Sequence, residues 1–117
     1  MTKNLESEVG IKNDNGKAPL ALIPTKPLLE IARVLDFGRM KYSSHNWRNG
    51  IEQERLLSAA LRHILANNEG ENKDEESGLN HLAHACCCLL FALEQQLREE
   101  TYSEFDDRFI AKDNCVD

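Results

Sequence analysis

The sequence predicts an all-α fold, a helical bundle of three to four helices. Apolar residues recur at helical spacing in three long segments, and no segment alternates apolar and polar residues over the length of a strand. The 117 residues suit one compact domain, and an aromatic content of only 6% leaves the core to aliphatic side chains. We therefore predict a single helical domain over residues 12–110, between a mobile N-terminal segment, 1–11, and a frayed tail, 111–117.

The first helix is predicted to follow Thr25, which can cap it, with Pro27 in its first turn. Leu28, Ile31 and Leu35 lie near one face of this helix. Gly38 should weaken the helix, so we place its end between residues 37 and 41.

The segment from Lys41 to Gly50 is predicted to be a loop. It gathers cationic, aromatic and amide side chains, namely Lys41, Tyr42, Asn46, Trp47 and Arg48. Trp47 alone is as well explained by closing the end of the bundle as by binding a ligand. The whole group, however, favours a nucleotide pocket more than any one member does.

The second helix is predicted from about Ile51 to Asn68, with Gly70 ending it in a left-handed conformation. Its apolar stripe consists of Leu56, Leu57, Ala60, Leu61, Ile64 and Leu65. Residues 102–110 are expected to form a short last helix, or an arm that docks on a neighbour.

The third helix is predicted to begin between Asp74 and Gly78 and to continue to about Glu100. It carries two stripes, one of Leu82, Cys86, Leu89, Leu90, Leu93 and Leu97, the other of His81, His84, Cys88, Phe91 and Gln95. Because this helix is apolar on most of its circumference, we expect a second subunit to cover part of it, in a homo-oligomer such as a dimer or tetramer.

Charge and cysteine content limit the class of protein. The net charge of −6 and the pI near 5.2 argue against binding a nucleic acid polymer, which needs a basic face, but allow a small anionic ligand bridged by metal ions. The longest apolar run, 83–93, is too short to cross a membrane. Consecutive cysteines at 86–88 cannot pair with one another in a helix and are expected to be buried thiols, which predicts a cytoplasmic location.

An acidic segment joins the second and third predicted helices. On a helical turn, Glu71 and Asp74 would point to one side at i, i+3, and Glu76 could add a third oxygen, a donor set that favours Mg²⁺ or Mn²⁺. Arg62, His63, His81 and His84 flank the segment. The alternatives are a solvated acidic loop, acids that complement a helix dipole, and a zinc site of His81, His84 and Cys88.

A series of short motifs follows in order between Lys12 and Leu93. These motifs are Asn15-Gly16-Lys17-Ala18, Leu22-Ile23-Pro24, Phe37-Gly38, Lys41-Tyr42, Asn46-Trp47-Arg48-Asn49-Gly50, Leu61-Arg62-His63, Gly70-Glu71, Asp74, Glu76-Ser77-Gly78 and His81-x-x-His84-Ala85. Their order and spacing resemble the phage dATP/dGTP diphosphohydrolase family, the MazZ-type relatives of the MazG-like all-α nucleotide pyrophosphohydrolases.

The resemblance implies Mg²⁺-dependent hydrolysis of a purine deoxynucleoside triphosphate, dGTP or dATP, to the monophosphate and pyrophosphate. It also implies an oligomeric bundle, commonly a dimer of dimers. MazG-like enzymes use an E-x-x-E pair on one helix and an E-x-x-D pair on the next. Glu71-x-x-Asp74 matches the second pair, whereas the first pair is absent and leaves Glu76, His63 and His81 as substitutes.

On this reading, the catalytic residues are His63, Glu71 and Asp74, and the metal ligands are Glu71, Asp74, Glu76 and His81. Residues expected to bind the substrate are Lys17, Lys41, Tyr42, Asn46, Trp47, Arg48, Arg62 and His84. A cation would activate water for attack on the α-phosphorus, while a carboxylate or His63 accepts the proton. The alternative is a non-enzymatic acidic helical protein that inhibits a host enzyme and consumes no nucleotide.

Overall fold

The computed structural model describes residues 9–111, so the predictions for residues 1–8 and 112–117 lie outside the described part. The α-helices are α1 (Thr25–Lys41), α2 (Gln53–Asn68), α3 (His81–Leu97) and the short α4 (Glu99–Tyr102), and the 3-10 helices are η2 (Leu20–Leu22), η3 (Asn46–Asn49) and η4 (Ser103–Phe105). Over residues 9–111 there is no strand, only an isolated β-bridge between Lys73 and Asn80. The predicted all-α class is confirmed.

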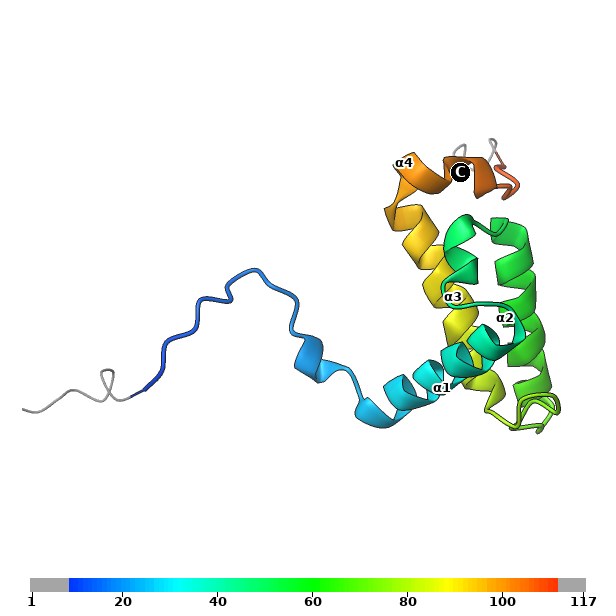
Figure 1. Cartoon of the computed structure of the whole chain (residues 1–117), viewed down its shortest axis with the longest axis horizontal. Helices are drawn as coiled ribbons and strands as arrows, with labels where there is room; N and C mark the ends of the chain where they lie inside the picture. Colours follow the sequence, from blue (N-terminus) through cyan, green and yellow to red (C-terminus); the bar gives the residue numbers. More distant parts are fainter. Residues whose placement is uncertain (1–8, 112–117) are drawn as a thin grey trace, which may run out of the picture.

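Helix α3 lies at the centre, with α2 and α1 both packed against it (Figure 1). Its buried residues are mostly small, namely Ala83, Ala85, Cys87 and Ala92, so neighbouring helices can approach closely. Val34 of α1 meets Ala83 and Cys87 in a core that Ile31, Leu79 and Phe91 surround. Cys86, in contrast, is exposed, so the prediction that all three consecutive cysteines are buried is wrong for this residue. None of the described helices is both long and apolar enough to cross a lipid bilayer.

The second helix ends as predicted, while two predicted helix starts differ. Gly70, just beyond the end of α2, has a φ of +97°, as expected of a glycine that terminates a helix. Thr25 is the first residue of α1 rather than its cap; Pro24 occupies the cap position and forms no side-chain bond. The predicted start of the third helix is wrong, because α3 begins only at His81.

Residues 69–80, here called the acidic loop, connect α2 to α3. The backbone N–H of His81 donates to the carbonyl of Asn72 at 2.8 Å, and the N–H of Asp74 donates to the carbonyl of Leu79 at 2.8 Å. These bonds fold the chain back on itself instead of continuing a helix. Glu71 and Asp74 therefore do not share a helical turn, and the i, i+3 argument for them fails.

Residues 42–50, here called the pocket loop, run from α1 towards α2 and are fixed from two sides. The buried Gln95 of α3 binds both the N–H and the carbonyl of Ile51, at 2.8 Å each. The Tyr102 hydroxyl donates to the Arg48 carbonyl at 2.8 Å, and the Phe105 ring packs directly on Gly50. The predicted last helix over residues 102–110 is therefore present only as far as Phe105, at the end of α4 and in η4, and residues 106–110 are not helical. The segment docks on the chain's own loop.

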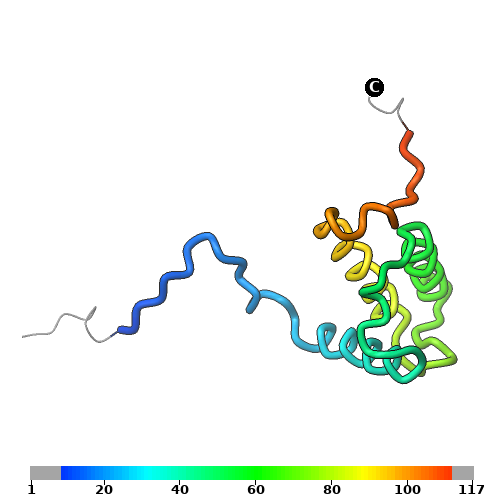
Figure 2. The backbone as a smooth tube through the Cα atoms, turned by 45° about the horizontal axis from the view of Figure 1, so that its top comes forward, coloured from blue at the N-terminus to red at the C-terminus, as the bar shows by residue number. Residues whose placement is uncertain are grey.

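The N-terminal segment, residues 9–24, extends away from the helices (Figures 1 and 2). It contains a turn at Gly16, in which the N–H of Lys17 donates to the Asp14 carbonyl at 3.0 Å. Leu20 and Leu22 are 71% and 80% exposed in this segment. Lys17, which belongs to this segment, is exposed.

Exposed leucines on α3 support the prediction of a homo-oligomer. Leu89 and Leu93 are 44% and 51% exposed. They are one helical turn apart, so they lie next to each other on one face of α3. We expect light scattering to give the mass of a dimer or tetramer at micromolar concentration, because a second subunit would remove this surface from water. The double variant Leu89→Lys/Leu93→Lys should shift the mass towards the monomer. A wild-type protein that stays monomeric would contradict the prediction.

Candidate functional site

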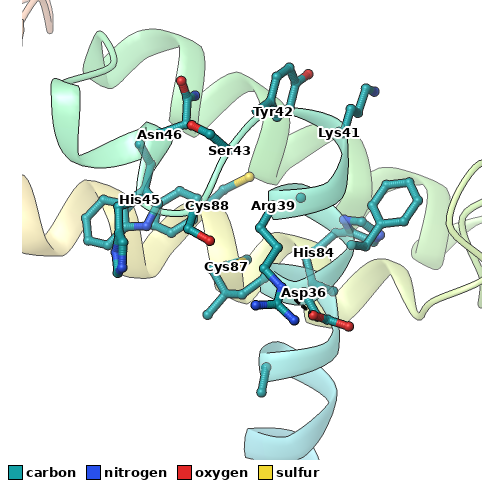
Figure 3. Close-up of a pocket in the computed structure, with 18 of the residues that line it drawn as sticks. Asp36, Arg39, Lys41, Tyr42, Ser43, His45, Asn46, His84, Cys87 and Cys88 are labelled. Carbon is teal, nitrogen blue, oxygen red and sulfur yellow. Dashed lines mark hydrogen bonds and ion pairs between the residues drawn. The ribbon is translucent and has the colours of Figure 1, made fainter.

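A pocket of about 730 Å³ opens between α1, the pocket loop and α3 (Figure 3). Figure 3 shows Cys87 and Cys88 on α3 close to the loop residues Ser43, His45 and Asn46, while the side chains of Lys41 and Tyr42 point away from these cysteines. Most of the predicted site residues line this pocket, namely Lys41, Tyr42, Asn46, Trp47, Arg48, His63, Asp74, Glu76 and His84. The structure therefore brings acidic, imidazole, cationic and aromatic groups together.

On one side of the pocket, two imidazoles and a carboxylate form a hydrogen-bonded chain. The Nδ1 atoms of His63 and His81 are 2.8 Å apart, and Nε2 of His81 is 2.5 Å from Oε1 of Glu71. An ionised carboxylate only accepts, so His81 donates its Nε2–H to Glu71. A neutral His81 then has a lone pair on Nδ1, and His63 donates to it. The lone pair of His63 is consequently on Nε2.

Ser77 organises the residues next to this chain. Its backbone N–H donates to Oδ2 of Asp74 at 2.9 Å, and its hydroxyl lies 2.7 Å from Nε2 of His84. The same hydroxyl accepts the N–H of Leu79 at 3.1 Å, which leaves its proton free to point at His84. The rings of His84 and His63 stack at a centroid distance of 4.7 Å. Sequence reasoning did not single out Ser77, although it lies within the Glu76-Ser77-Gly78 motif.

The surroundings of these groups favour neutral imidazoles beside an ionised carboxylate. Burial is the main cause that lowers the pKa of His63, and the neighbouring His84 and His81 lower it further. Burial likewise lowers the pKa of His84, against the opposing effect of Asp74. For Asp74, burial is the largest single effect and raises the pKa, but the bonds from Ser77 and the nearby imidazoles outweigh it and the pKa is lowered.

The rest of the pocket lining includes cationic and aromatic side chains. The Trp47 ring stacks on Phe91 at a centroid distance of 4.6 Å, and the Arg48 guanidinium lies 4.4 Å from the centre of the Trp47 ring. Lys41 binds the Glu76 carboxylate at 2.9 Å, an exposed contact that raises the pKa of Lys41. Phe91 was not predicted as a site residue, but it shares its helical stripe with His84 and Cys88, which would have pointed to it.

Four predicted site residues do not line the pocket. Lys17 belongs to the extended N-terminal segment, and Arg62 is exposed on α2. Glu71 and His81 do not line the pocket, but His81 is hydrogen-bonded to both Glu71 and the pocket residue His63. His81 is grouped with His63 and Asp74, not with His84 and Cys88 as the zinc alternative required.

Comparison with known proteins gives two matches. The sequence model of the family described as dATP/dGTP diphosphohydrolase, N-terminal, matches residues 7–108. A protein of Salmonella phage PMBT28 named dATP/dGTP diphosphohydrolase is 49% identical over 82 residues, which cover 70% of this chain and 28% of the relative. The chain thus spans less than a third of the length of this relative. No solved structure matches significantly.

Proposed function

Because the chain belongs to the dATP/dGTP diphosphohydrolase N-terminal family, we propose that it hydrolyses a purine deoxynucleoside triphosphate to its monophosphate and pyrophosphate. The observation that carries the proposal is that Asp74, Glu76 and imidazoles with lowered pKa line the same pocket as Lys41, Arg48 and aromatic rings. Such a pocket offers groups for a metal-bound triphosphate at one side and for a base at the other. The reaction would adjust deoxynucleotide pools, in a phage context such as that of the relative.

The donors in the pocket fit Mg²⁺ as an ion carried by the nucleotide. Mg²⁺ binds through one or two carboxylates and substrate phosphates and keeps several waters. Asp74 and Glu76 are the two pocket acids that act on the pKa of His84, whereas the Glu71 carboxylate is bound to His81. We assign Asp74 and Glu76 to this ion, which when bound would polarise the phosphate oxygens and the attacking water.

The protein's own groups would then orient the substrate and accept a proton. Lys41 and Glu76 form an exposed pair whose separation costs little, so Lys41 can turn to a phosphate while Glu76 turns to the cation. Arg48, at the same wall, adds a second positive charge. The proton from the attacking water passes to a pocket carboxylate or to the lone pair on Nε2 of His63.

The most accessible aromatic surface for the base is Tyr42, which is 65% exposed and lines the pocket. Trp47 already stacks on Phe91 and lies against Arg48. We expect Tyr42→Ala to raise KM about tenfold with a smaller change in kcat, since one stacked base contributes roughly 1–3 kcal/mol. Tyr42→Phe is the matched control and should behave as the wild type. Equal KM values for Tyr42→Ala and Tyr42→Phe would assign the base to another group.

A panel of nucleotides with product identification tests the reaction. We expect dGMP or dAMP plus pyrophosphate, with much slower turnover of dCTP and dTTP because a larger base stacks over more ring area. Release of orthophosphate and a diphosphate would contradict attack at the α-phosphorus. If no nucleotide is consumed in the presence of Mg²⁺, the acidic binding protein becomes the better explanation.

A further inference from the structure

The N-terminal segment, residues 9–24, carries apolar side chains that its own chain leaves exposed. The segment extends away from the helices (Figures 1 and 2). Ile11 is 92% exposed, and every residue from 9 to 29 is exposed, including Leu20 and Leu22 of η2. Apolar area of this kind stays in water until another surface covers it.

A second hollow, here called the groove, has the chemistry to hold such a segment. It measures about 450 Å³ and lies where the first two turns of α1 and α3 meet the acidic loop. Its apolar lining residues are Ile31, Leu82, Ala83 and Cys86. Three amides also line it, those of Asn67, Asn72 and Asn80. Since an amide both donates and accepts, these side chains suit the backbone N–H and C=O groups of an extended chain, beside a lining that accepts its apolar side chains.

We propose that the N-terminal segment of one chain binds in the groove of a second copy of this chain, and that the second copy returns the contact. Leu82 and Cys86 of the groove are exposed and belong to the same stripe of α3 as Leu89 and Leu93. The groove therefore opens onto the face where a second subunit is predicted. A two-fold dimer uses the same surface on both subunits, as a reciprocal exchange requires. The proposal does not depend on which reaction the pocket performs.

The junction between the segment and α1 favours a second copy over the chain's own groove. Ile23 has φ −73° and ψ 126°, and Pro24 has φ −65° and ψ 136°, so both residues are extended. The ring of Pro24 fixes its own φ and keeps the preceding Ile23 out of the helical region. Lys26 and Pro27, just beyond this junction, line the groove. To reach its own groove, Leu22 would have to reverse direction within two residues that are held extended.

The side chains of the segment match the groove in shape and charge. The N–H of Ile23 donates to the carbonyl of Leu20 at 3.1 Å, and residues three apart in a 3-10 helix lie on one side, so Leu20 and Ile23 can enter the groove together. The segment carries two lysines and one acid, while the nearby acidic loop presents the exposed Glu69 and Glu71. This balance favours a copy of the segment over an acidic peptide.

Disulfide cross-linking between two chains tests the contact, because Cys86 already lies in the groove. A full chain with Leu20→Cys and Cys86→Ser is mixed with the wild-type chain and oxidised gently with oxidised glutathione. We expect a disulfide between position 20 of the variant and Cys86 of the wild type, identified by mass spectrometry of the linked peptides. Phe109→Cys with Cys86→Ser is the matched control, since Phe109 is 85% exposed and lies outside the groove. The control should give no more linked product than the wild-type chain alone.

Light scattering of the variant Leu20→Asp/Leu22→Asp gives a second measurement. The dissociation constant of the dimer should rise at least about tenfold, because each subunit loses two buried leucines. Phe109→Asp/Ile110→Asp replaces two equally exposed apolar residues elsewhere and should leave the constant unchanged. Circular dichroism should show intact helices in both variants, since all four positions are exposed.

Three results would overturn the exchange. The first is linked product no greater than in the Phe109→Cys control. The second is a disulfide within one chain when Leu20→Cys is made alone and Cys86 is kept, which would place the segment in its own groove. The third is an unchanged dissociation constant in Leu20→Asp/Leu22→Asp, or a wild-type chain that is monomeric. Exchange without any nucleotide turnover would refute the proposed reaction alone.

Discussion

Asp74→Asn is expected to lower the turnover of a purine deoxynucleoside triphosphate roughly 100-fold or more, the scale of losing one electrostatic contact to the transition state. The lowered pKa of Asp74 keeps its carboxylate ionised at neutral pH, so the substitution removes a charge at the wall of the pocket. An asparagine can still accept the backbone N–H of Ser77, which Asp74 binds at 2.9 Å. The acidic loop should therefore keep its fold while activity is lost.

Steady-state kinetics with pyrophosphate detection, together with far-ultraviolet circular dichroism, measures this effect. Glu75→Gln is the matched control, because it removes an exposed acid from the same loop without touching the pocket. The control should retain nearly the full rate. Wild-type turnover in Asp74→Asn would exclude Asp74 from the reaction and move the site elsewhere.

Gly50→Ala is expected to destabilise the protein by about 3 kcal/mol, through backbone strain and overpacking together. Gly50 has a φ of +103°, and a Cβ atom there would lie 2.2 Å from Cε2 of Phe105. The Phe105 ring also packs near Tyr102, with ring centroids 6.3 Å apart, and Tyr102 is itself held by its bond to Arg48. The melting temperature should fall by roughly 10–20 °C.

Thermal unfolding followed by circular dichroism measures the change, and Gly38→Ala is the matched control. Gly38 lies in α1 with no atom within 4 Å of an added Cβ, so alanine there should be neutral or stabilising. Adding Phe105→Ala to Gly50→Ala should recover the part of the loss that comes from the clash. If the Gly50→Ala melting temperature stays at the Gly38→Ala value, the packing of Phe105 on Gly50 is incorrect.

The three long helices could be predicted because their apolar spacing is local information. Leu56 and Ala60 of the predicted stripe, for example, are buried on α2, which packs against α3, whereas Leu61 and Leu65 of the same stripe are exposed. The start of α3 could not be predicted in this way. Acids at 74–76 have the composition of a first helical turn, while the observed start depends on the bridge from Lys73 to Asn80 and on the bond from His81 to Asn72.

The sequence allowed most residues of the candidate site to be predicted, but not how their side chains are paired. Clustering along the sequence identified both walls of the pocket, including Trp47 and His84. The relation between Glu71 and Asp74 was lost once they proved to lie in a loop, where Glu71 binds His81 and Asp74 binds Ser77. Such pairings depend on how distant segments pack together, and they cannot be predicted from the periodicity of the sequence.

The docking of the C-terminal segment on the pocket loop has a consequence for the order of folding. The bond from Tyr102 to Arg48 joins residues 54 positions apart, and Oδ1 of Asp107 accepts the N–H of Glu54 across 53 positions. Both contacts need residues beyond 97, whereas α1, α2 and α3 can already pack when residue 97 has left the ribosome. The helices therefore precede a finished pocket during synthesis, and Trp47, the single tryptophan, reports the late step by its fluorescence.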